Sequence, residues 1–212
     1  PGADTQLTVE EVNHAILKST GILHIGSLSL TDEPVRSATH FAVKAAKSAG
    51  AVISYDPNYR ASLWENEAMA KARMRELLPY IDVMKLSDEE TALLTDETEP
   101  EQAARRLNEK GIHCVAVTLG KKGAFISING VSEFVQGYPI PAIDTTGAGD
   151  AFWGGFLHRM VTLKKRPEQL VLAEAIDCAE WGNAVATCCV QKRGAIPAMP
   201  SLEDVKVLMA EK

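Results

Sequence analysis

Cysteine is scarce in this sequence, and its few residues follow no metal-binding pattern. Among 212 residues, none of the four cysteines forms a Cys-x-x-Cys pair, and the five histidines are not spaced as zinc ligands. These absences argue against a zinc-binding protein. They favour reduced thiols packed in helices or strands, as in a cytosolic protein. The cysteines are Cys114, Cys178, Cys188 and Cys189.

Long apolar runs and clusters of positive charge are also missing. No segment has the pattern of a signal peptide or the length of a membrane span. The chain has 22 Lys and Arg against 28 Asp and Glu, for a net charge of -6, and its basic residues are scattered. We therefore expect a cytoplasmic protein that binds neither nucleic acid nor a membrane.

What the sequence does have is a regular alternation of apolar strands and helices. Continuous apolar segments predict strands at 21–26, 51–55, 81–84 and 114–119. Strands that are apolar along their whole length are typical of a parallel sheet covered on both faces. Asn129-Gly130 predicts a β-hairpin between 123–128 and 131–138. The pattern favours an α/β fold, a Rossmann-like three-layer sandwich with a mostly parallel sheet, as a single domain over residues 1–212.

Local signals place several helix ends and one edge of the sheet. Thr31 is an N-cap candidate for a helix with early acids and an early proline that stops near Gly50. Ligands bind at the carboxyl ends of parallel strands, so the loops that carry Gly26 and Asp56–Arg60 should share one edge. The other predicted helical stretches are 65–78, 88–94, 100–110, 148–163, 167–190 and 201–210.

The segment from Asp144 to Phe152 carries the clearest chemical signal. It reads Asp-Thr-Thr-Gly-Ala-Gly-Asp-Ala-Phe, with small residues leading into an apolar helix. A helix N-terminus presents unpaired N–H groups and a partial positive charge, and glycine lets a phosphate approach them closely. Asp150 lies in the first turn, where the dipole favours the ionised form that a general base needs. The alternative is a plain capped helix in which Asp150 serves only the dipole.

Two other phosphate-binding motifs are excluded. No Lys-Ser/Thr pair follows the last glycine, as a Walker A loop requires, either here or at Gly120–Gly123. A dinucleotide fingerprint needs Gly or Ala where Phe152 stands, and a βαβ unit behind it. An anion cradle beside a carboxylate is instead the minimum apparatus for moving a phosphoryl group onto an alcohol.

The same nine residues, followed by Gly154-Gly155-Phe156, resemble the C-terminal signature of the pfkB family of carbohydrate kinases, which implies a ribokinase-like fold. Ser87 stands where this family usually has Asn. Four further segments agree: 56–60 and 192–197 resemble fructokinase segments (the first also 2-keto-3-deoxygluconate kinases), 85–90 is similar to the family's Asn-x-x-Glu motif, and 117–124 resembles its nucleotide strand and loop.

The resemblance implies a role for each candidate site residue. Asp150 would be the base that takes the proton from the sugar hydroxyl. Gly147, Ala148 and Gly149 would donate backbone N–H groups to the γ-phosphate as charge develops. The residues implied near the nucleotide are Thr118, Gly120, Gly123 and Asn183, and those implied near the phosphate or sugar are Arg60, Asn58 and Gly26.

The implied cofactors are ATP, Mg²⁺ and, in some relatives, K⁺. Glu90 would act through magnesium and its waters, because magnesium gives up its hydration shell reluctantly. Asp144, Thr146 and the Gly194 backbone match positions that hold a monovalent cation in some relatives, although Ala198 stands where some of them have Ser.

Plainer interpretations of three of these residues stay open at this point. Glu90 could be a solvated helix acid, and Thr118 an ordinary strand residue. Arg60 could form a surface ion pair with Glu65 or Glu67.

Fructokinases are the subfamily that the sequence resembles most, which implies phosphate transfer from ATP to the terminal hydroxyl of fructose. 2-Keto-3-deoxygluconate or a riboside would be alternative substrates. The chain resembles only the C-terminal two thirds of the family. We therefore expect a fragment, with the lid, most sugar contacts and any homodimer contact outside it. The second hypothesis is a non-catalytic, pfkB-like regulatory or structural subunit, against which the intact Asp144–Asp150 segment argues.

Overall fold

The computed structural model describes residues 2–211, and the chain divides into two compact units. The boundary falls within strand β4 (Cys114–Thr118), between Val115 and Ala116. The first unit contains α1 (His14–Ser19), β1 (Ile22–Ile25), α2 (Val35–Ser48), β2 (Val52–Tyr55), α3 (Glu67–Glu76), β3 (Val83–Ser87), α4 (Thr91–Thr95) and α5 (Pro100–Glu109). The second contains β5 (Gly123–Ile128), β6 (Val131–Gln136), α6 (Ala148–Thr162), α7 (Leu172–Val190) and α8 (Leu202–Ala210).

The strands follow one another in chain order, from β1 to β6. In the first unit, β1 pairs with β2 and β2 with β3, both in parallel, with Ile22 opposite Val52. In the second unit, β5 and β6 form an antiparallel hairpin in which Ile128 lies opposite Val131. The prediction of an α/β fold with a mostly parallel sheet is confirmed.

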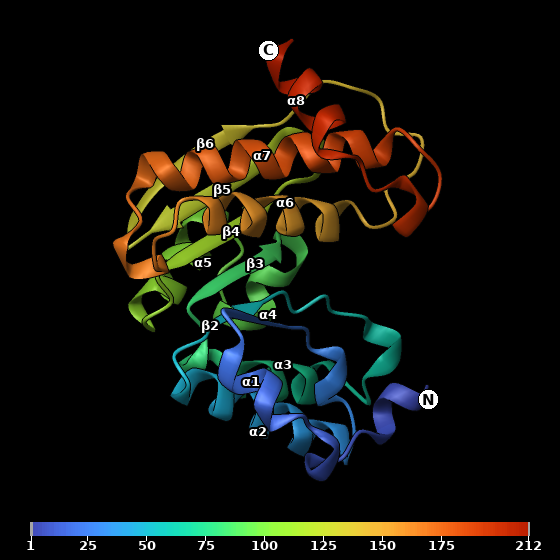
Figure 1. Ribbon diagram of the computed structural model, residues 1–212, viewed down its shortest axis with the longest axis vertical. Coiled ribbons are helices and arrows are strands. Elements are labelled where there is room, and N and C mark those ends of the chain that lie inside the picture. The colour runs from blue at the N-terminus through green and yellow to red at the C-terminus, as the bar shows by residue number, and fades with distance from the viewer. Residues whose placement is uncertain (1, 212) are drawn as a thin grey trace. The chain divides into compact units, whose positions relative to one another are not determined.

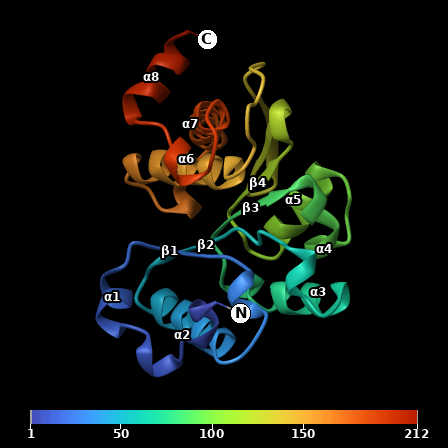
Figure 2. The ribbon, with the colours of Figure 1, turned by 90° about the vertical axis from the view of Figure 1, so that its right-hand side faces the viewer.

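The first unit is built around β2, a strand that is buried along its whole length. All four residues of β2 are buried, and Ile53 and Tyr55 have no exposed surface. Helices α1, α2 and α3 lie on one side of β1 and β2 (Figures 1 and 2). Helix α2 contributes Val43 and Ala46 to the core, both fully buried. A central strand covered on both faces accounts for the continuous apolar runs in the sequence.

The second unit depends on close packing of α6 against α7. The two helices run side by side in Figure 1, and glycines line their contact. A Cβ on Gly155 would lie 2.7 Å from a methyl carbon of Val185, and one on Gly182 would lie 2.8 Å from the ring of Phe152. The contact therefore needs glycine at both positions. It packs the body of α6 tightly against α7 and so fixes the position of the N-terminus of α6 within this unit.

Several predicted element boundaries move, and three of these changes have a clear local reason. Thr31 does not cap α2, because its hydroxyl donates to the Leu28 carbonyl at 2.9 Å and the helix begins at Val35. Helix α7 begins at Leu172 rather than 167, because residues 167–169 form a separate 3-10 turn. Strand β3 runs to Ser87, beyond the predicted end at 84, since the charge of Lys85 is neutralised within the core.

The hairpin turn matches its prediction. Asn129 and Gly130 both have positive φ, at 48° and 84°. Two central residues with positive φ define a type I′ turn, whose twist suits an antiparallel hairpin.

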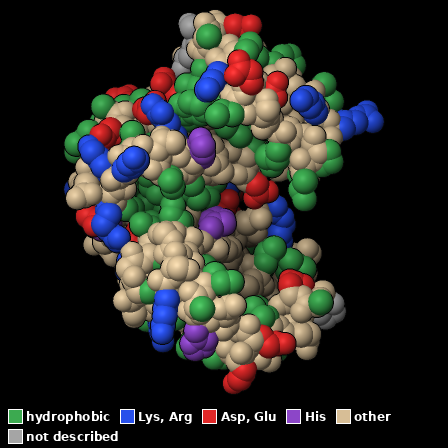
Figure 3. All heavy atoms as spheres, in the orientation of Figure 1, with side chains coloured by type: hydrophobic (Ala, Val, Ile, Leu, Met, Phe, Trp, Pro, Cys, Tyr) green, Lys and Arg blue, Asp and Glu red, His purple; other side chains and the backbone are tan. Residues whose placement is uncertain are grey.

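The helices, the charges on the face shown in Figure 3 and the Cys178 thiol give no sign of a membrane span, a single-sign charged face or a reactive cysteine among the described residues. Among residues 2–211, no helix is long and apolar enough to cross a membrane. Basic and acidic side chains are interspersed over the face shown in Figure 3. None of the four cysteines forms a disulfide, and burial raises the pKa of Cys178 to about 12. That thiol therefore stays protonated and inert at neutral pH.

Candidate functional site

The N-terminus of α6 is entered through a left-handed residue. Gly147 is the N-cap, with φ 78° and ψ 4°, and a Cβ there would lie 2.8 Å from the Cβ of Ala195. Both the dihedral angle and the neighbouring chain therefore require glycine at this position. The turn exposes the start of the helix, where backbone N–H groups lack partners within the helix.

The three residues predicted to form an anion cradle differ in their available donors. The N–H of Ala148 donates to the Thr145 carbonyl at 3.1 Å, which closes a turn before the helix. Within residues 2–211, no hydrogen bond occupies the N–H of Gly147 or Gly149. The cradle thus offers two open N–H groups at the positive end of the helix dipole.

Asp150 lies in the first turn of α6, exposed to solvent. The next residue, Ala151, is buried with Cys189 and Ala198 and anchors the start of the helix to α7. The N–H of Ala151 also donates to the Gly147 carbonyl at 2.8 Å. The carboxylate of Asp150 therefore stands on a fixed backbone while its own oxygens face solvent.

Asp144 ties the approach to the cradle to a distant loop. Its Oδ1 accepts from the Thr146 hydroxyl at 2.7 Å and the Thr146 N–H at 2.9 Å, and its Oδ2 accepts from the Gly194 N–H at 2.9 Å. These bonds, the Thr146 hydroxyl first, lower the pKa of Asp144 to about 2. The structure thus brings together the three residues predicted to hold a monovalent cation.

The loop after β4 is the second glycine-rich feature of this unit. Thr118 ends β4 half-buried, and Gly120 and Gly123 follow with φ of 56° and 121°. A Cβ on Gly123 would lie 2.1 Å from the Val135 carbonyl oxygen, so the hairpin can close only with glycine there. The N–H of Leu119 donates to the Gly123 carbonyl at 2.8 Å and fixes the loop.

Asn183 is buried beneath the hairpin. Its side-chain amide nitrogen lies 3.3 Å from both the Val135 and the Gln136 carbonyl oxygens, to which it donates. In this structure the residue joins α7 to the end of β6. Its predicted place near a nucleotide remains a prediction.

In the first unit, the loop after β2 is tied down by a buried ion pair. The Asp56 carboxylate accepts from Lys85 Nζ at 2.8 Å and from the Asn58 N–H at 3.2 Å. Asp56 and Lys85 are both buried, with side chains 5% and 7% exposed. The loop that holds Gly26 joins this arrangement, because the Ser27 N–H donates to the Pro57 carbonyl at 3.0 Å.

Glu90 is buried, and hydrogen bonds engage both of its carboxylate oxygens. Oε1 accepts from the Tyr59 N–H at 2.7 Å, and Oε2 accepts from the Ser87 N–H at 2.8 Å and the Ser87 hydroxyl at 3.0 Å. Burial, then the charges of Glu90 and Asp56, raises the pKa of Tyr55 well above its usual value. The interpretation of Glu90 as a solvated helix acid is wrong, because it is only 6% exposed.

Arg60 differs from its neighbours in the same loop. It is exposed, and its Nη1 donates to the carbonyl of Tyr59 at 3.0 Å. Within the part of the chain that the structure describes, it forms no ion pair with Glu65 or Glu67, and Glu67 pairs with Lys71 at 2.8 Å. The guanidinium thus keeps most of its donors for other groups.

Two residues outside the predicted site shape these loops. Lys85 pairs with Asp56, and a lysine within a run of strand residues is a signal of a buried partner. Ser87, which departs from the family motif, belongs to a Ser-x-x-Glu capping box. Among the described residues, no cluster of three or more His, Cys, Asp or Glu side chains could hold a metal directly.

Comparison with known proteins places this geometry in a family. The family model described as "pfkB family carbohydrate kinase" matches residues 1–202. Fructokinase from Vibrio alginolyticus is 37% identical over 208 residues, which is 97% of this chain and 65% of that protein. The chain thus spans less than two thirds of the length of this relative.

Solved structures give the same result. A double mutant of fructokinase from Vibrio cholerae O395, with fructose, ADP and potassium ion bound, has a TM-score of 0.87 and 31% identity, and the match covers 98% of this chain and 65% of that one. Fructokinase from Xylella fastidiosa with bound ATP has a TM-score of 0.91 and 28% identity, over 100% of this chain and 68% of that one.

Proposed function

Because the chain belongs to the pfkB family of carbohydrate kinases, we propose that it carries the nucleotide and phosphoryl-transfer part of an ATP-dependent fructokinase. The observation that carries the proposal is the N-terminus of α6, where an exposed Asp150 stands beside two open backbone N–H groups. Similarity to fructokinases crystallised with fructose, ADP or ATP supports the choice of substrates.

The residues at the start of α6 have complementary roles in this proposal. Asp150 accepts the proton of the sugar hydroxyl as its oxygen attacks the γ-phosphorus of ATP. The bond to the bridging oxygen breaks, and ADP leaves with the electron pair. The N–H groups of Gly147 and Gly149 stabilise the negative charge on the transferring group, while Ala148 holds the turn through Thr145.

The remaining residues bind and orient. Thr118, Gly120 and Gly123 would line the nucleotide, and Asn183 would act by fixing the β6 backbone beside it. In the first unit, Gly26, Asn58 and the exposed Arg60 would face sugar or phosphate.

The oxygen atoms present fit the two implied ions, magnesium through a water molecule and potassium by direct contact. The three bonds to Glu90 leave one lone pair on Oε1, which suits acceptance from a magnesium-bound water rather than direct ligation. Asp144, the Thr146 hydroxyl oxygen and the Gly194 carbonyl would hold a potassium ion. Magnesium would supply positive charge to the phosphates.

The identity of the sugar, the cellular location and the oligomeric state are further parts of the proposal. 2-Keto-3-deoxygluconate or a riboside stay alternative substrates, because such sites select a sugar by hydrogen bonds to its hydroxyl groups. A cytosolic location would suit four cysteines that form no disulfide, and a homodimer remains a prediction.

Calorimetry with ATP and Mg²⁺ tests the proposal, with Asp150→Asn and the exposed Asp4→Asn as a matched charge control. We expect saturable nucleotide binding by all three proteins. In a protein that also carries the N-terminal third of the relatives, transfer to fructose should fall by about 10²- to 10⁴-fold in Asp150→Asn alone. No binding by the folded wild-type chain would overturn the nucleotide assignment. Binding without transfer to any sugar by that longer protein would favour the non-catalytic subunit instead.

A further inference from the structure

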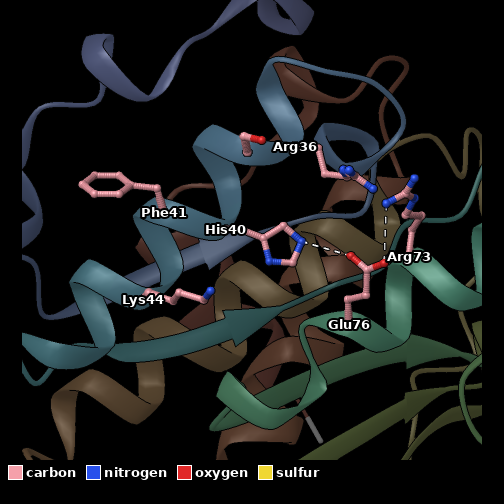
Figure 4. A pocket seen from close by; sticks show the side chains of 7 residues that line it. Arg36, His40, Phe41, Lys44, Arg73 and Glu76 are labelled. Atoms are coloured by element: carbon pink, nitrogen blue, oxygen red, sulfur yellow. Dashed lines mark hydrogen bonds and ion pairs between the residues drawn. The ribbon is translucent and has the colours of Figure 1, made fainter.

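A second concave site lies in the first unit, between α2 and α3. It is an open pocket of about 550 Å³, and most of its polar lining is basic. We call it the α2–α3 pocket (Figure 4). Helix α2 supplies Arg36, His40 and Lys44, which lie four residues apart and therefore on one face, and α3 supplies Arg73 and Glu76.

The positive charges of this pocket exceed its negative charge. Glu76 is the one acid in its lining; it accepts from His40 Nε2 at 3.2 Å and forms an ion pair with Arg73 Nη1 at 3.5 Å. Within residues 2–211, no carboxylate lies within ion-pair distance of Lys44, whose Nζ sits 5.9 Å from the centre of the Tyr80 ring. Outside the lining, Glu33 pairs with Arg36. The three permanent cations of the pocket therefore face two nearby carboxylates, and Lys44 carries the remaining positive charge.

Arg36 contains a cationic donor that is buried without a partner. Its Nε and Nη2 bind Glu33 Oε1 at 2.8 Å and 2.7 Å, but Nη1 is buried and makes no hydrogen bond. Figure 4 shows the guanidinium groups of Arg36 and Arg73 beside each other at the edge of the pocket. Two like charges side by side repel, and a buried unpaired donor is costly, so an anion at this point would relieve both.

We propose that the α2–α3 pocket binds a small phosphate monoester. A guanidinium presents parallel donors that match phosphate oxygens, and Lys44 adds a flexible point charge. The volume exceeds what a bare phosphate fills, which leaves room for a short organic group. None of its lining residues belongs to the loops proposed for phosphoryl transfer, so this is a separate ligand site.

Side-chain NMR of His40 gives a readout specific to this pocket, which matters because the cradle at α6 should also attract phosphate. His40 is one of five histidines, and its ring signal can be assigned by its loss in His40→Gln. Glycerol phosphate and inorganic phosphate are titrated at fixed pH, with sodium chloride at matched ionic strength as the screening control. We expect the His40 signal to shift saturably with phosphate and not with chloride.

The two phosphate arms distinguish the source of the ligand. Tighter binding of glycerol phosphate supports the monoester, whereas equal or weaker binding than inorganic phosphate overturns the monoester assignment. A His40 shift that is linear, or that chloride reproduces, overturns the site altogether.

Paired variants test the charges that carry the proposal. Lys44→Gln/Arg73→Gln should weaken the phosphate-induced shift of His40 at least tenfold, since both removed cations line the pocket. Arg105→Gln and Lys110→Gln together remove the same charge from the α5 region of the same unit and should leave it unchanged. Equal affinity in the two double variants would refute the proposal, and if the first does not fold, Lys44→Gln alone decides it.

Discussion

Two buried acids of the first unit differ from the proposed base of the second unit in how their oxygens are used. In the first unit, Asp56 and Glu90 are buried, and the oxygens of both accept hydrogen bonds or an ion pair from neighbouring groups. In the second unit, Asp150 is exposed at the start of α6, beside N–H groups that no hydrogen bond within residues 2–211 occupies. We call an acid committed when neighbouring groups bind its oxygens, as in Asp56 and Glu90, which hold a loop in place. Asp150 is uncommitted, and beside an anion cradle it is available for chemistry.

This difference separates positioning residues from the proposed base. The loop at 56–60 contains one left-handed residue, Asn58, at φ 48°, and its backbone is held by Asp56 and Glu90. Arg60 at the end of that loop is exposed and keeps most of its donors. Asp56 and Glu90 thus hold the backbone of the loop that carries Arg60, and their loss should reduce stability.

Breaking the ion pair of the first unit should have the largest effect on stability. Lys85→Met leaves Asp56 charged and buried without its partner, which costs about 3–5 kcal/mol in unfolding free energy. Urea denaturation measures it. The double variant Asp56→Leu/Lys85→Met removes both charges and should recover much of the loss. A loss below about 1 kcal/mol in the single variant would mean that water reaches the pair.

The comparison is sharpest between one committed and one uncommitted acid. Glu90→Gln can present its oxygen to the Tyr59 N–H or to the Ser87 N–H, but its amide group then faces the other donor. We expect a loss of about 1.5–3 kcal/mol. Asp150→Asn should change stability by less than about 0.5 kcal/mol, because its side chain is exposed. Thermal unfolding measures the stability of both variants. Equal losses of stability would contradict the view that Glu90 holds the loop and Asp150 does not contribute to stability.

The cradle can also be broken through its backbone. Gly147→Ala adds a Cβ at φ 78° and 2.8 Å from the Cβ of Ala195, and should cost about 1–3 kcal/mol. Gly154→Ala, in the same helix and with nothing within 4 Å of the new carbon, should instead stabilise by about 0.5–1 kcal/mol. Denaturation midpoints that move in the same direction would show that the turn at Gly147 is not strained.

The sequence predicted the repeating parts of this fold well, because apolar periodicity follows burial directly. Every expected strand and helix is present, and the Asn129-Gly130 turn has the expected positive φ angles. The prediction ended β3 too early because Lys85 is charged, and only the distant Asp56 makes its burial acceptable. Thr31 failed as an N-cap because a 3-10 turn before it offers the Leu28 carbonyl to its hydroxyl.

The geometry of the candidate site was predictable where it depends on one segment. Nine consecutive residues predict glycines that lead into a helix with Asp150 in its first turn, and the structure has this arrangement. The environment of Glu90 could not, because it depends on the Tyr59 backbone from another loop. The hydrogen bond from Gly194 to Asp144 likewise joins residues that are 50 positions apart. Contacts of this kind exist only once the fold is known.

Among the committed acids, we expect the smallest effect on stability from Asp144, the acid near the cradle whose oxygens both accept hydrogen bonds. Its pKa falls from 3.8 to about 2 because the Thr146 hydroxyl and the Gly194 and Thr146 N–H groups bind its ionised form. A lowered folded pKa means that the contribution is present above pH 4 and is lost as pH falls towards 2. Carboxyl NMR titration should give a midpoint near 2, and Asp144→Asn should flatten the pH dependence of stability across that window. A midpoint near 3.8 would mean that these bonds do not persist in solution, and the separation of Asp144 from the uncommitted Asp150 would fail.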